Sequence, residues 1–127
     1  MQFSFSAMKE FQLTKALIML VRVLGLAAIV LGAFLWAGHA PLLASHIGTG
    51  FGLSMLVFVL AVVAMTKKAV LHGILGVVFA TLLPLVGFLQ LPLTFHTLGM
   101  IQVIHIMIAL MTIGVAERLY ATIQRAG

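Results

Sequence analysis

Four apolar stretches, each long enough to cross a bilayer as a helix, constrain this chain more than any other feature. Hydrophobic residues make up 64% of the 127 residues and charged residues only 7%. Soluble domains are about half apolar and about a quarter charged, so no water-soluble core could hide this much apolar surface. Because a membrane helix satisfies its own backbone hydrogen bonds, we expect an all-α integral membrane protein.

The breaks between the apolar stretches set the expected spans. We expect a single domain, residues 1–127, with spans at about residues 16–37, 42–65, 69–91 and 97–116 and an interfacial segment at residues 1–14. Pro84 should bend the third span, because it removes one backbone hydrogen bond. Connections this short make neighbouring helices antiparallel, which predicts an up-down-up-down four-helix bundle.

The basic residues indicate the orientation of the bundle. The formal net charge is +5, and Lys and Arg gather at those ends of the apolar stretches that share one side of the membrane. The positive-inside rule then predicts that both termini are cytoplasmic, and we expect a bacterial inner (plasma) membrane. A nucleic-acid partner is not expected, because the charges form no basic face. The absence of cysteine excludes disulfides and haem attached through thioether bonds.

The histidines are the strongest candidates for chemistry, because an ionisable group inside hydrocarbon is costly. The chain has five histidines and two acidic residues, Glu10 and Glu117, both near predicted span ends, which argues against a transporter driven by a deep carboxylate. His72 falls at the cytoplasmic start of the third span and is expected only to mark that boundary. The other four histidines fall toward the non-cytoplasmic half: His39, His46, His96 and His105.

His46 and His105 lie on the second and fourth spans, which run in the same direction. At 1.5 Å per residue they lie roughly 6 and 12 Å past the starts of their spans, which are compatible depths. Two imidazoles that face each other across a bundle are what a six-coordinate haem iron requires. Gly50 and Ala109, each four residues after its histidine, would leave room for the macrocycle. The plainer interpretation is that both histidines and the small residues only pack helices together.

The remaining polar candidates have weaker roles. His39 is either an ordinary interfacial side chain or a partner for a haem propionate. His96 lies nine residues before His105, on the opposite helix face, and is a poorer ligand but a reasonable propionate or interface partner. Methionines of the fourth span, such as Met107, are reserve axial ligands that also serve as ordinary core residues.

These motifs resemble a known family. The segments PLLASHIGTGFGLSMLVFVLAVVA and IQVIHIMIALMTIGVAERL, separated by a span that ends in Gln and Pro, resemble one four-helix half of the haem A synthase family over about Leu42 to Leu119. The resemblance implies haem bound near the outer face by His46 and His105. The first span lacks a histidine and no acidic residue stands where synthase chemistry would need one, so a single-haem cytochrome b is the expected relative.

The sequence indicates two functions. The first is a small membrane cytochrome b with one haem b (iron) held by His46 and His105, which moves electrons between quinol or another membrane donor and a redox partner protein. The second is a cofactor-free structural or accessory subunit of a larger complex or a homo-oligomer. In that case the small residues of the first span, such as Gly25 and Gly32, would contact the partner. An oligomeric pore is a weaker third possibility.

Overall fold

The structure is a computed structural model that describes residues 5–91 and 99–126. Its elements, in chain order, are α1 (Phe5–Trp36), a short 3-10 helix η1 (Ala40–Leu42), α2 (Leu43–Thr66), α3 (Val70–Leu89) and α4 (Gly99–Ala126). The four α-helices are all long and apolar enough to cross a membrane, and the described residues contain no strand. The predicted all-α, four-helix membrane architecture is confirmed at this level.

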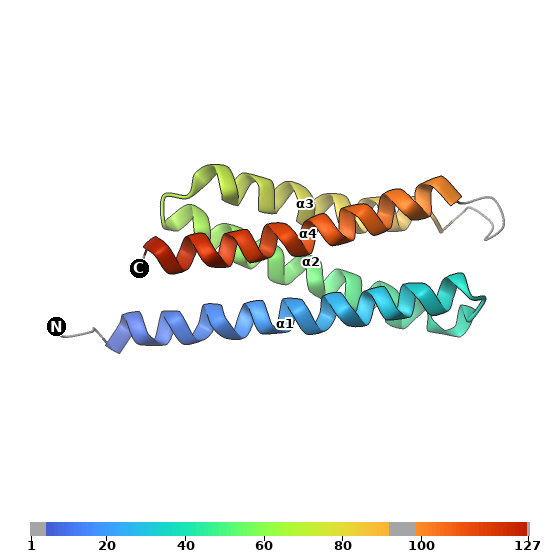
Figure 1. Cartoon of the computed structure of the whole chain (residues 1–127), viewed down its shortest axis with the longest axis horizontal. Helices are drawn as coiled ribbons and strands as arrows, with labels where there is room; N and C mark the ends of the chain where they lie inside the picture. The colour runs from blue at the N-terminus through green and yellow to red at the C-terminus, as the bar shows by residue number, and fades with distance from the viewer. Residues whose placement is uncertain (1–4, 92–98, 127) are drawn as a thin grey trace.

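Consecutive helices run in opposite directions (Figure 1). Phe5, the Lys67–Lys68 turn and Ala126 therefore lie at one end of the molecule, which we call the lysine end. The α1–α2 connection, with Gly38 and His39, lies at the opposite end. Gly38 has φ +94°, a conformation that favours glycine, and it allows α1 to turn sharply into η1.

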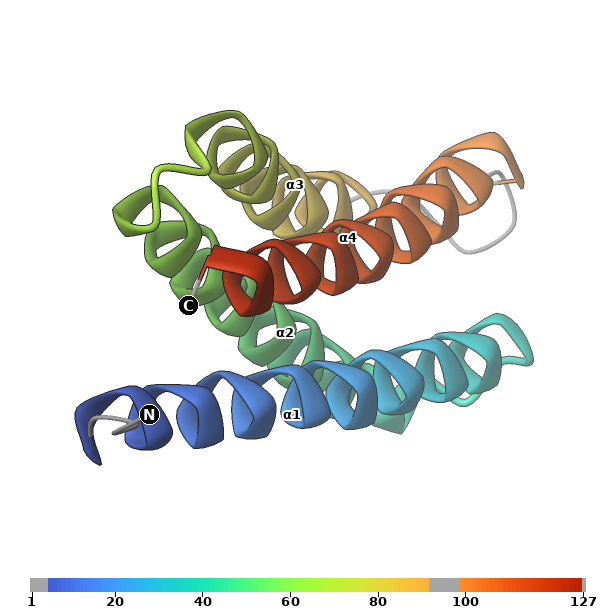
Figure 2. The ribbon, with the colours of Figure 1, turned by 60° about the vertical axis from the view of Figure 1, so that its left-hand side comes forward.

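Two of the helices form the middle of the bundle. α2 and α4 contact each other and both outer helices, whereas α1 and α3 make no close approach to each other within the described residues. Figure 2 shows α1 and α3 on opposite sides of this pair. The two parallel helices, α2 and α4, are thus direct neighbours, which brings together the helices that carry His46 and His105.

The tightly packed core lies in the half of the bundle near the lysine end. Its fully buried members come from α1, α2 and α4: Ile18, Val21, Leu53, Val57, Leu60, Ala61, Ala64, Ala116 and Leu119. α3 joins this core through glycine, since a Cβ built on Gly76 would lie 2.7 Å from the Cβ of Ala61. Such close helix approach needs small residues, because lipid provides no hydrophobic drive for association.

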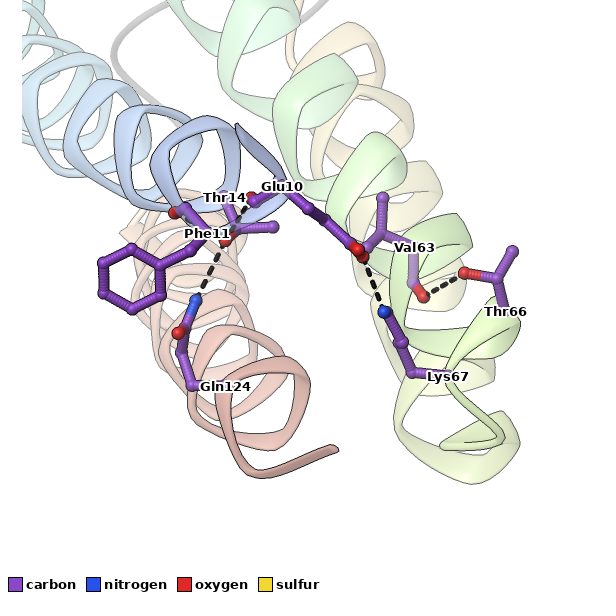
Figure 3. A network of polar contacts seen from close by, with 7 residues as sticks. All are labelled: Glu10, Phe11, Thr14, Val63, Thr66, Lys67 and Gln124. Carbon is purple, nitrogen blue, oxygen red and sulfur yellow. Dashed lines mark hydrogen bonds and ion pairs between the residues drawn. The ribbon is translucent and has the colours of Figure 1, made fainter. Parts of the chain in front are cut away.

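Polar contacts join the helices at the lysine end (Figure 3). The carboxylate of Glu10 pairs with Nζ of Lys67 at 2.8 Å. The side-chain amide of Gln124 donates to the hydroxyl of Thr14 at 2.9 Å, and that hydroxyl lies 3.1 Å from the carbonyl of Phe11. These contacts connect the first turns of α1 to the last turns of α2 and α4.

Two helices extend beyond the predicted spans. α1 begins at Phe5, so residues 5–14 are helical and continuous with the first span. α4 continues ten residues past the predicted boundary at 116. In both stretches no Gly or Pro interrupts the helix, and charged side chains end an apolar run without ending a helix.

The outer surface is that of a lipid-facing protein. Large apolar side chains project from every helix, with Leu26 64%, Leu71 69% and Met100 78% exposed. Contiguous apolar exposure on this scale is not stable against water. It matches the hydropathy of the four helices and supports integration in a membrane.

Candidate functional site

A cavity of about 360 Å³ opens in the half of the bundle away from the lysine end. Its volume is in the range of small-molecule sites, roughly 300–1,000 Å³. All four helices contribute to its walls, which are mainly apolar. The small and polar residues of the wall on α1 and α2 are Gly25, Ala28, Gly32, Ala33, His46 and Gly50. Those on α3 and α4 are Gly87, Gln90 (the residue that caps α3), Gln102, His105 and Ala109, and Pro84 of α3 also lines the cavity.

His46 and His105 meet in this cavity. Their ring centroids are 6.1 Å apart and the ring planes are inclined by 68°. The two side chains come from parallel helices 59 positions apart in the chain, so only the bundle brings them together. No other pair of histidine rings comes into contact within the described residues.

The ring of His46 is held on two sides by α1. Its Nδ1 lies 3.0 Å from the backbone carbonyl of Ala28. Because a carbonyl only accepts, Nδ1 is the protonated nitrogen, and the lone pair of the neutral ring then resides on Nε2. A Cβ built on Gly32 would lie 3.2 Å from Cε1 of His46, so glycine at this position lets the ring approach the backbone of α1.

His105 has a similar neighbour but lacks the hydrogen bond. A Cβ built on Gly87 of α3 would lie 3.3 Å from Cε1 of His105. Within the described part of the chain, the buried Nδ1 atom has no hydrogen-bond partner. A buried polar atom without a protein partner is uncommon, and it is usually satisfied by a water molecule, an ion or a ligand, or else it marks strain. Each histidine is thus packed against a glycine of the preceding helix, but only His46 has a fixed tautomer.

The distance between the two ring centroids, 6.1 Å, is close to the distance expected for two imidazoles on one metal. With metal–nitrogen bonds of about 2.0–2.1 Å and ring nitrogens about 1.1 Å from the centroid, two imidazoles on opposite sides of one metal have centroids about 6.3 Å apart. Among residues 5–91 and 99–126, no three or more His or acidic side chains gather in a group that could hold a bare metal ion. Two protein ligands are, however, the number that a haem uses.

The small residues expected beside the histidines line the same cavity. Gly50 has no neighbour within 4 Å of where its Cβ would lie, and Ala109 also lies in the wall. The small residues of α1 that were considered for partner contacts face inward as well. Gly25 approaches Ile113 and Gly32 approaches His46, so these two glycines pack within the bundle.

The other histidines lie elsewhere. His39 is exposed, its Nδ1 lies 3.2 Å from the carbonyl of Phe34, and it is not part of the cavity wall. His72 is exposed near the lysine end, as expected. His96 lies outside the described residues. Two amides, Gln90 and Gln102, line the cavity, and Gln90 donates to the carbonyl of Val86 at 3.2 Å.

Sequence reasoning missed an ion pair between α1 and α4, whose two side chains are about half exposed. Arg22 donates from Nε at 2.7 Å and from an amino group at 2.9 Å to the two carboxylate oxygens of Glu117. A bidentate pair of this kind joins α1 to α4. The signal was present, because Arg22 is the only cation within the apolar part of the first span, but its partner depends on the register of two distant helices.

Comparisons with protein-family models, with curated proteins and with solved structures find no match to this chain. The resemblance to the haem A synthase family therefore stays a prediction from the residues.

Proposed function

We propose that this chain is a small membrane cytochrome b that holds one haem between His46 and His105 and transfers electrons within the membrane. The observation that carries the proposal is the meeting of these two rings, 6.1 Å apart, in a largely apolar cavity. Bound haem would supply a one-electron iron couple, and two histidine ligands, His46 and His105, would favour electron transfer over oxygen chemistry.

The chain's own groups would prepare the site in three ways. The Ala28 carbonyl orients His46 and leaves Nε2 as the ligand atom, the usual arrangement for a metal-bound histidine. Gly32 and Gly87 let the two rings lie close to neighbouring helices. Gly50 and Ala109 limit side-chain volume along the cavity wall, and the apolar wall keeps water away from the pair.

The orientation of the bundle belongs to the same proposal. By the positive-inside rule the lysine end faces the cytoplasm, which puts both termini inside and the histidine pair in the outer half of a bacterial inner membrane. Electrons would then come from quinol or another membrane donor and pass to a redox partner at the outer face. A cofactor-free accessory role is the competing proposal, and it predicts a colourless protein.

Haem content tests the proposal directly. The purified protein, saturated with haemin, should hold about one haem per chain, and His46→Ala or His105→Ala should lose most of it because haem binding depends on both ligands. His72→Ala is the matched control, since this histidine lies at the other end of the bundle, and it should keep the wild-type content. Equal haem content in all three variants would refute ligation by this pair.

A further inference from the structure

A second, smaller hollow of about 200 Å³ lies between α3 and α4, near the lysine end. It is lined by His72 and Leu75 of α3 and by Val115, Arg118 and Leu119 of α4. His72 and Arg118 are exposed, whereas Leu119 is fully buried in the core. The hollow thus combines a cation and an imidazole with an apolar floor.

Arg118 has no acidic side chain as its counter-ion among the residues that the structure describes. The sequence contains seven Lys and Arg residues but only two acidic residues. Both acidic side chains are engaged elsewhere, Glu10 by Lys67 and Glu117 by Arg22. Although Glu117 precedes Arg118 directly, the helix turns it toward α1, away from the hollow. Within residues 5–91 and 99–126, no acidic side chain therefore complements the charge of Arg118.

The depth of the hollow indicates where a negative charge complementary to Arg118 would come from. α3 has 20 residues and is about 30 Å long at 1.5 Å per residue, which matches the hydrocarbon thickness of a bilayer. His72 is the third residue of this helix and so lies near the level of the lipid headgroups. An arginine side chain is long enough to extend to the same level from within the membrane.

We propose that this hollow is a binding site for an anionic phospholipid. The phosphate would lie between the Arg118 guanidinium and the His72 imidazole, both of which can donate hydrogen bonds, and an acyl chain would pack on Leu75 and Val115. Basic pockets between membrane helices on the cytoplasmic side are suited to such headgroups. The proposal does not depend on haem, since the hollow and the cavity share no lining residue.

Native mass spectrometry with added phosphatidylglycerol or phosphatidylcholine tests the site. Wild-type protein should bind phosphatidylglycerol more tightly than phosphatidylcholine. Arg118→Gln should weaken that binding about fivefold, which corresponds to about 1 kcal/mol for one basic residue near the headgroups. The matched control is Arg125→Gln, which removes the same charge from an exposed position of α4 outside the hollow and should have little effect.

Arg118→Lys keeps the positive charge and should retain most of the preference for phosphatidylglycerol. This variant distinguishes a loss of lipid binding caused by the missing charge from one caused by misfolding. Inorganic phosphate should not displace the lipid, because it lacks the acyl chain. Equal losses in Arg118→Gln and Arg125→Gln, no preference for the anionic lipid, or displacement by phosphate would each overturn the proposal.

Discussion

Glycine determines how closely each histidine approaches its neighbouring helix. Gly32 lies against His46 and Gly87 lies against His105, in each case with almost no room for a methyl group. The same arrangement occurs in both helical hairpins, α1–α2 and α3–α4. The sequence shows a faint parallel, since both histidines are followed by isoleucine and by a small residue four positions later.

Gly32→Ala and Gly87→Ala are therefore expected to weaken haem binding. The added methyl group would lie 3.2 or 3.3 Å from a ring carbon and displace the ring by a few tenths of an ångström. Overpacking of this kind costs about 1–3 kcal/mol, which predicts a loss of affinity between about fivefold and about 150-fold. Haemin titration measures the affinity of each variant for haem. Gly48→Ala is the control, because its Cβ would have no neighbour within 4 Å, and an equal effect there would contradict the steric explanation.

Pairs of helices are held together by different means along the bundle. α3 packs against α2 through Gly73 and Gly76, whose missing side chains let the helices meet near Ala61. α1 is joined to α4 by the Arg22–Glu117 pair and by the Thr14–Gln124 hydrogen bond. Substitution in each contact should reveal its contribution.

Gly76→Ala should destabilise the bundle. Its Cβ would lie 2.7 Å from the Cβ of Ala61 and 2.8 Å from a methyl of Leu119, and the first of these is fixed to the backbone of α2. We expect a loss of about 1–3 kcal/mol in the free energy of unfolding, measured by denaturation in mixed micelles. The variant Gly48→Ala again provides the control, and a Gly76→Ala protein as stable as wild type would show that α3 does not approach α2 as described.

Glu117→Gln should lower the thermal midpoint more than the double replacement Arg22→Gln/Glu117→Gln. The single variant leaves the Arg22 guanidinium without its counter-ion near the middle of α1, whereas the double variant removes both charges. Glu10→Gln should have a small effect, since an ion pair at the molecule's end is worth about 0–1 kcal/mol. Additive effects in the double variant would mean that Arg22 and Glu117 are not coupled.

At the scale of the whole molecule, the described residues are close-packed near the lysine end and surround a cavity in the other half. This division separates a region that maintains the fold from a region with space for a ligand. The lysines lie at one end of the bundle and the cavity lies in the other half. An inserted protein would therefore have its histidine pair nearer to one side of the membrane.

Cysteine labelling tests that orientation. The chain has no native cysteine, so single replacements report one position each. Ala40→Cys, exposed in η1, should react with a membrane-impermeant thiol reagent in intact cells. Thr66→Cys, exposed beside the lysine turn, should react only after permeabilisation. The reverse pattern would place the lysine end outside the cell.

The four helices and the turn at Lys67 and Lys68 could be predicted from the sequence. Both features depend only on local residues, namely the length of each apolar stretch and the lysines that flank it. The meeting of His46 and His105 was expected from parallel spans at compatible depths. The partners of those rings could not be predicted, because the Ala28 carbonyl, Gly32 and Gly87 belong to other helices whose register is set by packing. The Arg22–Glu117 pair could not be predicted for the same reason, since its two residues belong to different helices.

The most direct test of the central claim is an optical spectrum of the purified, haemin-incubated protein before and after reduction with dithionite. Ligation by two histidines predicts a Soret band that shifts on reduction and a sharp low-spin α band, both absent from a folded His46→Ala/His105→Ala variant. A wild-type protein that stays colourless and iron-free, or a double variant with the same spectrum as wild type, would contradict the claim that this bundle holds haem between the two histidines.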